Sequence, residues 1–291
     1  MVIMDTTGKK KTSGTKILRT VICVILCVLA IFPFYTLIIN STLRHADIAS
    51  GIKFLPGGHF IQNFKNLFDP EKQVVSTFSL FDAFRNSIVI TVPATILQIY
   101  FGSLTAYALT VYRFKGRDFA WGLIYGIMMI PTQVSIVGLI KVSQLTHLYG
   151  TLWPMILPAI AAPTTVYFMK QYMENGLSLE IVEAARIDGC SEFGIFNRIG
   201  LPLLKPAMAT QAIFAFVASW NNLYTPSILI GAERQLSTLP MYAEAIRSND
   251  KKQDYGQVYT ALLCAIIPII VAYLALSKYI IAGVALGGVK E

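Results

Sequence analysis

The sequence has 291 residues, of which 55% are hydrophobic and only 14% are charged, whereas soluble domains carry roughly 25% charged residues. This composition, with a mean hydropathy of +0.58, excludes an ordinary soluble protein and favours one integral membrane domain. The net charge is +8, but the basic residues cluster at the ends of apolar runs, where they orient a membrane protein, and the basic stripe that nucleic-acid binding requires is missing.

The N-terminal segment predicts a basic cytoplasmic tail over residues 1–17, followed by a first span. Three consecutive lysines at 9–11 precede the apolar run 21–39. This run is longer than a typical signal-peptide core, and no small-x-small cleavage site follows it. We therefore expect a retained span, with a cleaved signal peptide as the alternative.

Six apolar stretches approach or exceed the length of about 20 residues that a helix needs to cross the hydrocarbon core. We expect an all-α integral membrane fold, in which residues 18–291 form a single domain. The predicted spans cover about residues 18–39, 84–111, 119–140, 152–168, 206–230 and 259–277.

Positive charge near the span ends predicts the orientation. The short connection 112–118 holds Arg113, Lys115 and Arg117, whereas the connection between the third and fourth spans has almost no cations. Both termini are therefore expected on the inner side, N-in and C-in.

Prolines interrupt most of these spans, and each removes a backbone donor and kinks its helix. Such breaks persist in a membrane where protein or a wet cavity satisfies the freed groups. The pattern favours a transport pathway, but prolines are also common in membrane helices of other kinds.

The predicted spans carry almost no ionisable side chains, and His45, His59 and His147 all fall in predicted outer loops. Ion-driven transporters usually keep an ionisable residue at membrane depth, so the pattern argues against secondary transport and against a charged solute. We also find no catalytic constellation and no metal-ligand spacing. The four cysteines are expected to act as small buried apolar side chains.

The connection 175–205, on the predicted inner side, indicates two short helices. Ser178 can cap the first helix, and Gly189 can end it. A second helix is expected at about 192–198, ended by Leu201-Pro202.

Helical spacing places Ile181, Ala184, Ala185 and Asp188 on one face of the first helix. The two adjacent alanines would leave a smooth patch that another surface can approach closely. From the residues alone, a helix lying on the membrane surface is an equal alternative.

The same connection resembles the EAA loop of bacterial ABC importer permeases. Glu183-Ala184-Ala185 is followed after three residues by Gly189, after nine more by Ile199, and then by Leu201-Pro202, without departure from the family pattern. In that family the loop forms a coupling helix that docks on the ATPase subunit. The resemblance implies ATPase-coupling positions at Glu183, Ala184, Ala185, Asp188, Gly189, Ile199, Leu201 and Pro202.

Shorter matches resemble the carbohydrate branch, in particular the six-helix permease of maltose-type transporters. They lie at residues 112–117, 201–206, 220–222 and 278–283. The resemblance implies a MetI-like type I permease fold in a bacterial inner membrane, a sugar or oligosaccharide as solute, and partners comprising a second permease, two ATPase subunits and an extracellular solute-binding protein. A permease for a different small solute is the alternative.

No phosphate-binding G-x-x-x-x-G-K-[ST] motif occurs in the sequence. We therefore expect a subunit that is not itself an enzyme and that binds no cofactor or metal, with ATP and Mg²⁺ on the ATPase partners.

Polar and aromatic residues near the end of the fifth span are candidates for the solute path, because aromatic faces pack on sugar rings and amides hydrogen-bond to hydroxyls. Membrane-interface aromatics and helix-joining asparagines are the alternative explanation. The candidates are Trp220, Asn221, Asn222 and Tyr224, with Gln133 and Tyr167 as weaker ones.

The predicted outer loop 231–257 is a candidate contact for the binding protein. Its charged residues include Glu233, Arg234, Glu244 and Arg247. A solvated connector is the alternative.

Overall fold

The structure is a computed structural model that describes residues 14–69, 71, 75, 77–248 and 254–287, and no strand occurs within these ranges. Most of the predicted N-terminal tail lies outside them. The predicted all-α fold is confirmed. Three helices are long and apolar enough to cross a membrane, or up to five spans if each of two bent helix pairs counts as one.

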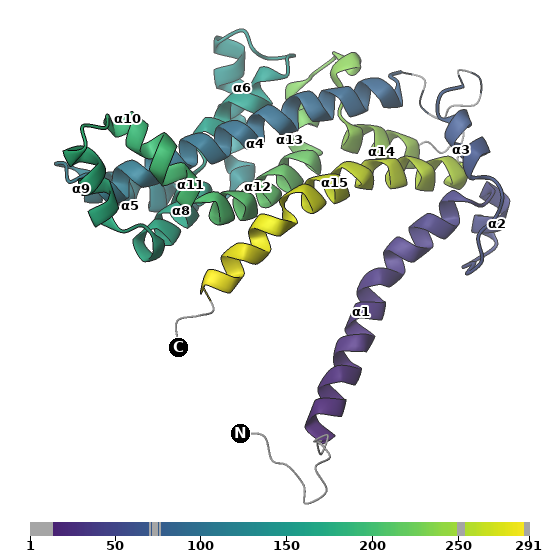
Figure 1. Cartoon of the computed structure of the whole chain (residues 1–291). Coiled ribbons are helices and arrows are strands. Elements are labelled where there is room, and N and C mark those ends of the chain that lie inside the picture. The colour runs from purple at the N-terminus through teal and green to yellow at the C-terminus, as the bar shows by residue number, and fades with distance from the viewer. Residues whose placement is uncertain (1–13, 70, 72–74, 76, 249–253, 288–291) are drawn as a thin grey trace, which may run out of the picture. The chain divides into compact units, whose positions relative to one another are not determined.

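The chain divides into two compact units, of which the first comprises residues 1–74 and 251–263 (Figure 1). Its helices are α1 (Gly14–Ser41), α2 (His45–Ala49), α3 (Phe60–Asn66) and the start of α15 (Tyr255–Gly287). The first predicted span lies within α1 and the sixth within α15, and both helices are long and apolar enough to cross a membrane.

Buried polar contacts hold the first unit together. The amide of Asn63, which is buried, donates to the carbonyls of Ser41 and Leu43, both at 2.9 Å. The ring of His45 stacks on Tyr255 with centroids 4.9 Å apart. The segment after α1, for which the sequence suggested no role, therefore has a defined structure.

The second unit, residues 75–250 and 264–291, is built on α4 (Leu80–Val111), which contains the second predicted span and is long and apolar enough to cross a membrane. The Ser79 hydroxyl caps α4 by accepting from the backbone N–H of Asp82 at 3.0 Å. Helices α8 (Pro163–Gly176) and α12 (Lys205–Trp220) pack along α4, as Figure 1 shows. Gly102 permits the approach of α8, since a Cβ there would lie 2.7 Å from Cγ2 of Thr165.

Three of the predicted spans are broken. Residues 119–140 form α5 (Arg117–Met128) and α6 (Thr132–Leu145), which meet at 103°. The break includes Pro131, which has no N–H to continue a helix. Residues 152–168 form α7 (Trp153–Ile156), the 3₁₀ turn η1 (Leu157–Ile160) and the start of α8, and a proline stands at the first or second position of each.

The fifth predicted span, residues 206–230, ends early at Trp220, and α13 (Tyr224–Leu229) follows after a break. Before α12 the chain bends by 79° from a run of short helices. These are α10 (Glu192–Ile195), the π-helical turn η2 (Phe196–Gly200) and α11 (Leu201–Leu203). The remaining helices of this unit are α9 (Leu179–Ile187), η3 (Arg234–Leu236) and α14 (Leu239–Arg247). A count of apolar residues measures length and cannot locate such breaks.

Candidate functional site

The predicted helix–turn–helix element of residues 175–205 is present. Helix α9 follows Ser178, although the Ser178 side chain makes no capping hydrogen bond. Gly189 has φ +77°, a conformation that glycine adopts without steric cost, which confirms the predicted stop. The second helical segment does not end at Leu201-Pro202 as predicted but runs on to Leu203, because proline is tolerated in the first turn of a helix.

One face of α9 is buried and the opposite one is exposed. Val182 is 1% exposed and Ala185 6% exposed, and both belong to the core around the C-terminal half of α4. Glu183, Ala184 and Asp188 are exposed. The predicted smooth patch of two alanines is therefore wrong, because consecutive helix residues point about 100° apart and Ala185 faces the chain's own core.

The exposed surface of α9 carries large apolar side chains. Ile187 is 87% exposed, and Ile181 and Leu179 are also exposed. Leu179 and Ile187 stand four residues before and after Glu183 and so share its side of the helix. Exposed apolar side chains of this kind are typical of a protein contact. Farther along, Ile199 and Leu201 pack against the core, whereas Pro202 is exposed.

Three side chains connect α9 and α10 to the end of α4. The Arg186 guanidinium donates to both carboxylate oxygens of Glu192, with Nε 2.6 Å from Oε1 and one terminal nitrogen 3.2 Å from Oε2. The hydroxyl of Tyr112, which follows α4 directly, donates to Oε2 of Glu192 at 2.9 Å. We call these three residues the clasp.

The clasp shifts the pKa of each member. The hydrogen bond from Arg186, helped by the one from Tyr112, lowers the pKa of Glu192. Burial, followed by the hydrogen bond to Glu192, raises the pKa of Tyr112 to about 12. The Glu192 hydrogen bond raises the pKa of Arg186. At neutral pH the three groups are therefore a carboxylate, a phenol and a guanidinium.

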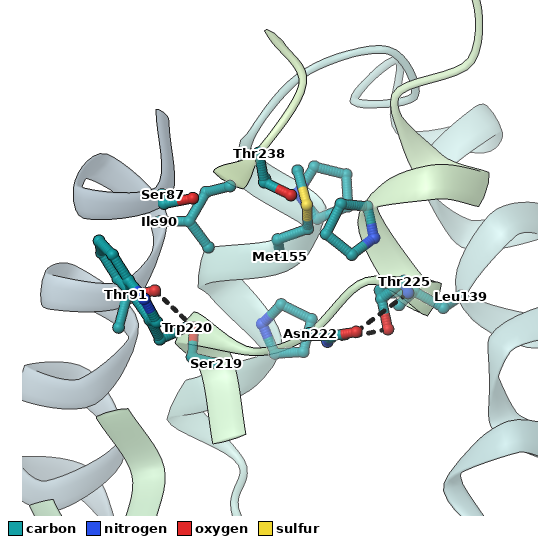
Figure 2. A pocket seen from close by; sticks show the side chains of 13 residues that line it. Ser87, Ile90, Thr91, Leu139, Met155, Ser219, Trp220, Asn222, Thr225 and Thr238 are labelled. Atoms are coloured by element: carbon teal, nitrogen blue, oxygen red, sulfur yellow. Dashed lines mark hydrogen bonds between the residues drawn. The ribbon is translucent and has the colours of Figure 1, made fainter. Parts of the chain in front are cut away.

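Two adjoining cavities lie along α4 and α12. The smaller has a volume of about 140 Å³ and is drawn in Figure 2, where dashed lines join Ser219 to Thr91 and Asn222 to Thr225. The larger has a volume of about 680 Å³. Met155, Pro158, Ser219 and Asn222 line both cavities. Among the described residues that line them, none is charged.

The larger cavity brings amides, hydroxyls and aromatic rings together. Its polar lining consists of Gln98, Thr132, Thr164, Tyr167, Gln211, Ser219 and Asn222. The ring of Tyr167 stacks on Trp121, with centroids 5.7 Å apart and an interplanar angle of 6°. Gln98 donates to the Thr165 hydroxyl at 2.8 Å, which ties α4 to α8 beside the cavity.

Residues 98–285 match the family of binding-protein-dependent transport system inner membrane components. The chain belongs to this family. It is 34% identical over 282 residues to AraQ of Bacillus subtilis (strain 168), an arabinooligosaccharide transport system permease protein, with 94% of this chain and 96% of that protein covered. It is 33% identical over 282 residues to MelC of the same organism, a melibiose/raffinose/stachyose import permease protein, covering 96% and 98%.

The fold is shared with a solved permease. A chain of the crystal structure of a bacterial ABC transporter involved in the import of the acidic polysaccharide alginate has a TM-score of 0.75 and 22% sequence identity, with 93% of this chain and 99% of that chain covered. The MetI-like permease fold expected from the resemblance is thereby confirmed.

In this permease Trp220 is a packing residue. It is 2% exposed, stacks on Phe216 at 5.6 Å and meets Phe84 edge-on at 5.8 Å. Its indole N–H donates to the carbonyl of Ala265 at 3.0 Å. Ala265 stands three residues before Pro268, in a turn of α15 that the proline weakens. Trp220 also lines the smaller cavity (Figure 2), so this solute candidate supports a helix at the edge of that cavity.

The other solute candidates fall into two groups, those that line a cavity and those that do not. Asn222 is half-buried and lines both cavities. It exchanges two hydrogen bonds of 3.1 Å with Thr225, through the Thr225 side chain and backbone N–H. Asn221, Tyr224 and Gln133 are exposed and outside both cavities. The weaker candidate Tyr167 is well placed, whereas Gln98, Thr164 and Gln211 were missed, since no motif marks polar residues that only the fold brings together.

The predicted binding-protein loop lies beside the first turns of α4. The amide of Asn86 donates to the carbonyls of Gln235 and Ser237 at 2.7 and 3.1 Å. Glu233 and Arg234 are exposed. Glu244 is half-buried and pairs with Arg247 in α14, at 2.9 Å. Three of the four cysteines expected to be buried are exposed, namely Cys23, Cys27 and Cys190, and Cys264 is half-buried.

Proposed function

We propose that this chain is a permease subunit of an ATP-driven, binding-protein-dependent importer of a neutral sugar or oligosaccharide. The observation that carries the proposal is the larger cavity, whose amide, hydroxyl and aromatic lining carries no charge among the described residues. Uncharged hydrogen-bonding groups beside aromatic faces suit a polyhydroxylated ring. The two relatives described above are named for transport of arabinooligosaccharides and for import of melibiose, raffinose and stachyose.

In this proposal the chain works by alternating access with separate motor subunits. Two ATPase subunits bind ATP and Mg²⁺, a second permease completes the pathway, and an extracellular binding protein delivers solute near residues 231–257. The chain has six membrane passages, both ends on the inner side of a bacterial inner membrane, and residues 175–205 facing the ATPases. The uncharged lining and the absence of a phosphate-binding motif in the sequence support this division of labour.

Coupling in this proposal starts at the exposed face of α9. Glu183, Ala184, Ile187 and Asp188 meet the ATPase, and Gly189 provides the turn. Ala185 and Val182, which are buried, join α9 to the membrane helices. A movement of the ATPase can shift the permease only if the contact favours one of its two states over the other.

Solute binding is assigned to the larger cavity. Tyr167 offers an aromatic face whose orientation is fixed by stacking on Trp121, with ring centroids 5.7 Å apart. Asn222, Gln98 and Gln211 are the partners for hydroxyl groups.

The experiment measures uptake into proteoliposomes that hold the assembled transporter, with neutral oligosaccharides and acidic oligosaccharides offered in parallel. Tyr167→Ala should raise the KM for a neutral sugar by about tenfold, equivalent to about 1.4 kcal/mol of binding free energy. Tyr224→Ala is the matched control, because Tyr224 is 55% exposed and outside both cavities. Equal KM values for the two variants, or a preference for acidic sugars, would contradict the assignment.

A further inference from the structure

The clasp joins two neighbouring helices, α9 and α10, to the end of a helix that lies about 80 residues earlier in the chain. Tyr112 ends the membrane helix α4, Arg186 lies in the last turn of α9, and Glu192 begins α10. Glu192 accepts hydrogen bonds from the other two, at 2.6 and 3.2 Å from Arg186 and 2.9 Å from Tyr112. The Arg186 guanidinium carbon also lies 5.9 Å from the centre of the Tyr112 ring. Glu192 therefore holds the exposed helix α9 to the end of a membrane span.

Buried aromatic rings continue this connection into α4. Tyr112 meets Tyr107 edge-on at 5.9 Å, and Tyr107 packs on Phe196 of η2 at 5.3 Å. Tyr107 and Phe196 are both 1% exposed. Gly200 lies beneath the Tyr107 ring, where a Cβ would be 3.4 Å from the nearest ring carbon. Closely packed rings have little free space and therefore move together.

The other end of α4 reaches the cavities. Ser87, Ile90 and Thr91 line the smaller cavity, and Ala94 and Gln98 line the larger one. From Gln98 to Val111 the helix contains no proline and rises about 20 Å at 1.5 Å per residue.

Pro93 lies between these two sets of cavity residues. A proline inside a helix removes one hydrogen bond and creates a hinge point. The segment of α4 that leads from the clasp to the larger cavity can therefore turn as one piece.

We propose that Glu192, through Arg186 and Tyr112, is a positioning residue that transmits the movement of α9 to α4 and so to the solute cavity. This inference rests on the proposed function, because it assigns the path by which ATPase movement reaches the solute. None of the three side chains needs to touch solute or nucleotide. Loss of the clasp should leave ATP hydrolysis by the ATPase subunits intact, while less of their movement reaches the solute cavity.

The test measures ATP hydrolysed per solute imported by the assembled transporter in proteoliposomes. Glu192→Gln removes the charge that holds Arg186, and Tyr112→Phe removes one hydroxyl but keeps the ring. Each should raise the ratio by about two- to fivefold, as the strength of an exposed ion pair allows. The double variant should be no worse than Glu192→Gln alone, since Tyr112 acts through Glu192.

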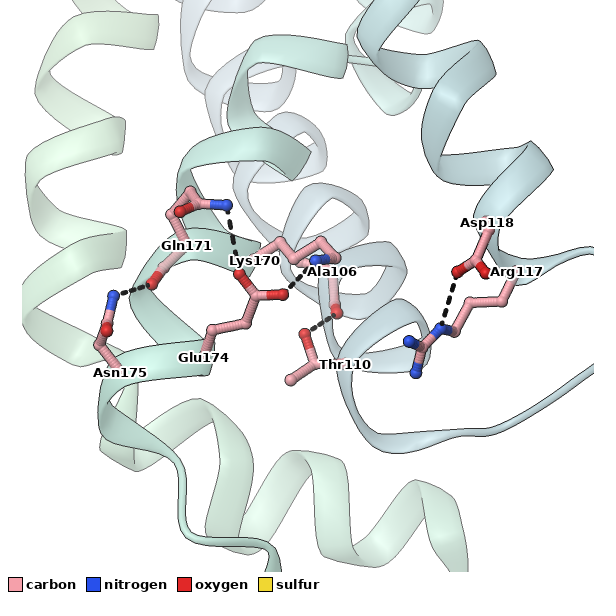
Figure 3. Close-up of polar contacts among 8 residues, drawn as sticks. All are labelled: Ala106, Thr110, Arg117, Asp118, Lys170, Gln171, Glu174 and Asn175. Carbon is pink, nitrogen blue, oxygen red and sulfur yellow. Dashed lines mark hydrogen bonds and ion pairs between the residues drawn. The ribbon is translucent and has the colours of Figure 1, made fainter.

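Glu174→Gln is the matched control. Glu174 pairs with Lys170 and accepts a hydrogen bond from Gln171, all within α8 (Figure 3). The substitution is the same and breaks an ion pair whose Glu174 side chain is 42% exposed. Lys170 keeps its place 4.5 Å from the ring centre of Trp121 in α5, so no helix is disconnected from another and the ratio should stay at the wild-type value.

Three outcomes would overturn the inference. The first is a wild-type ratio in both clasp variants, and the second is the same rise in Glu174→Gln. The third is a parallel loss of ATP hydrolysis and import at an unchanged ratio, which would make the clasp an assembly contact. Failure of the proposed function looks different, because the wild-type complex itself would then show no ATP-dependent sugar import.

Discussion

Replacing Trp220 separates packing from solute contact. Trp220→Ala removes a ring that is 2% exposed and lies against two other rings, and substitutions of this kind cost about 3–5 kcal/mol. Trp220→Phe keeps an aromatic ring and loses the 3.0 Å hydrogen bond to Ala265, which between membrane helices is worth about 0.6 kcal/mol. We therefore expect a large destabilisation for alanine and a small one for phenylalanine.

The assay combines thermal unfolding of the purified transporter complex with the concentration dependence of sugar uptake. The unfolding midpoint should fall slightly in Trp220→Phe and strongly in Trp220→Ala. The KM of Trp220→Phe should stay within about twofold of wild type, because Trp220 does not line the larger cavity, to which solute is assigned. A tenfold rise in the KM of Trp220→Phe at an unchanged unfolding midpoint would refute the packing role and show that Trp220 contacts solute.

Three further predictions concern the close helix contact, the buried face of the coupling helix and the clasp. Gly102→Ala should lower the unfolding midpoint, because its Cβ would lie 2.7 Å from Cγ2 of Thr165 and overpacking costs about 1–3 kcal/mol. The control Gly122→Ala has open space around its Cβ and should leave the midpoint unchanged or raise it. The opposite order of midpoints would exclude a tight α4–α8 contact. Val182→Asp should abolish transporter assembly in co-purification, because it buries an unpaired charge at a site that is 1% exposed; normal assembly would show that this face is not packed. The Tyr112 hydroxyl should titrate near pH 12, so its stabilising effect should be complete below pH 10 and lost as the pH rises through 12. In Glu192→Gln the pKa of Tyr112 should fall but stay above 10, because burial remains. The measurement is ultraviolet absorbance with Tyr112→Phe as the reference, and an unchanged pKa would show that Glu192 does not hold the hydroxyl.

The sequence predicted the fold where a single residue controls local structure. Gly189 marked the end of α9. The sequence also predicted a helix where the apolar run is long, since residues 21–39 lie within α1. The breaks within three of the spans were not predicted, because the length of an apolar run does not show where a chain bends. Pro131 and Pro163 nevertheless stand at or beside these breaks. The prolines indicated that helices would be interrupted, but not that α5 and α6 would meet at 103°.

The candidate site was predicted in part, for a related reason. Helical spacing on α9 treated Ala184 and Ala185 as one surface, whereas tertiary packing buries only Ala185. Trp220 and Asn222 stood together in one motif, yet Trp220 packs against α15 and lines only the smaller cavity, whereas Asn222 lines both cavities. Partners such as Gln98 come from a distant helix, and only the folded chain brings them beside Asn222.

Solute import by proteoliposomes, with and without the ATPase partners, tests the central claim most directly. The account predicts ATP-dependent import by the complete transporter, no import by this chain without the ATPases, and loss of import on Gly189→Pro, which cannot adopt φ +77°. Import of the sugar by the purified chain without an ATPase, or undiminished import by the Gly189→Pro transporter, would contradict it.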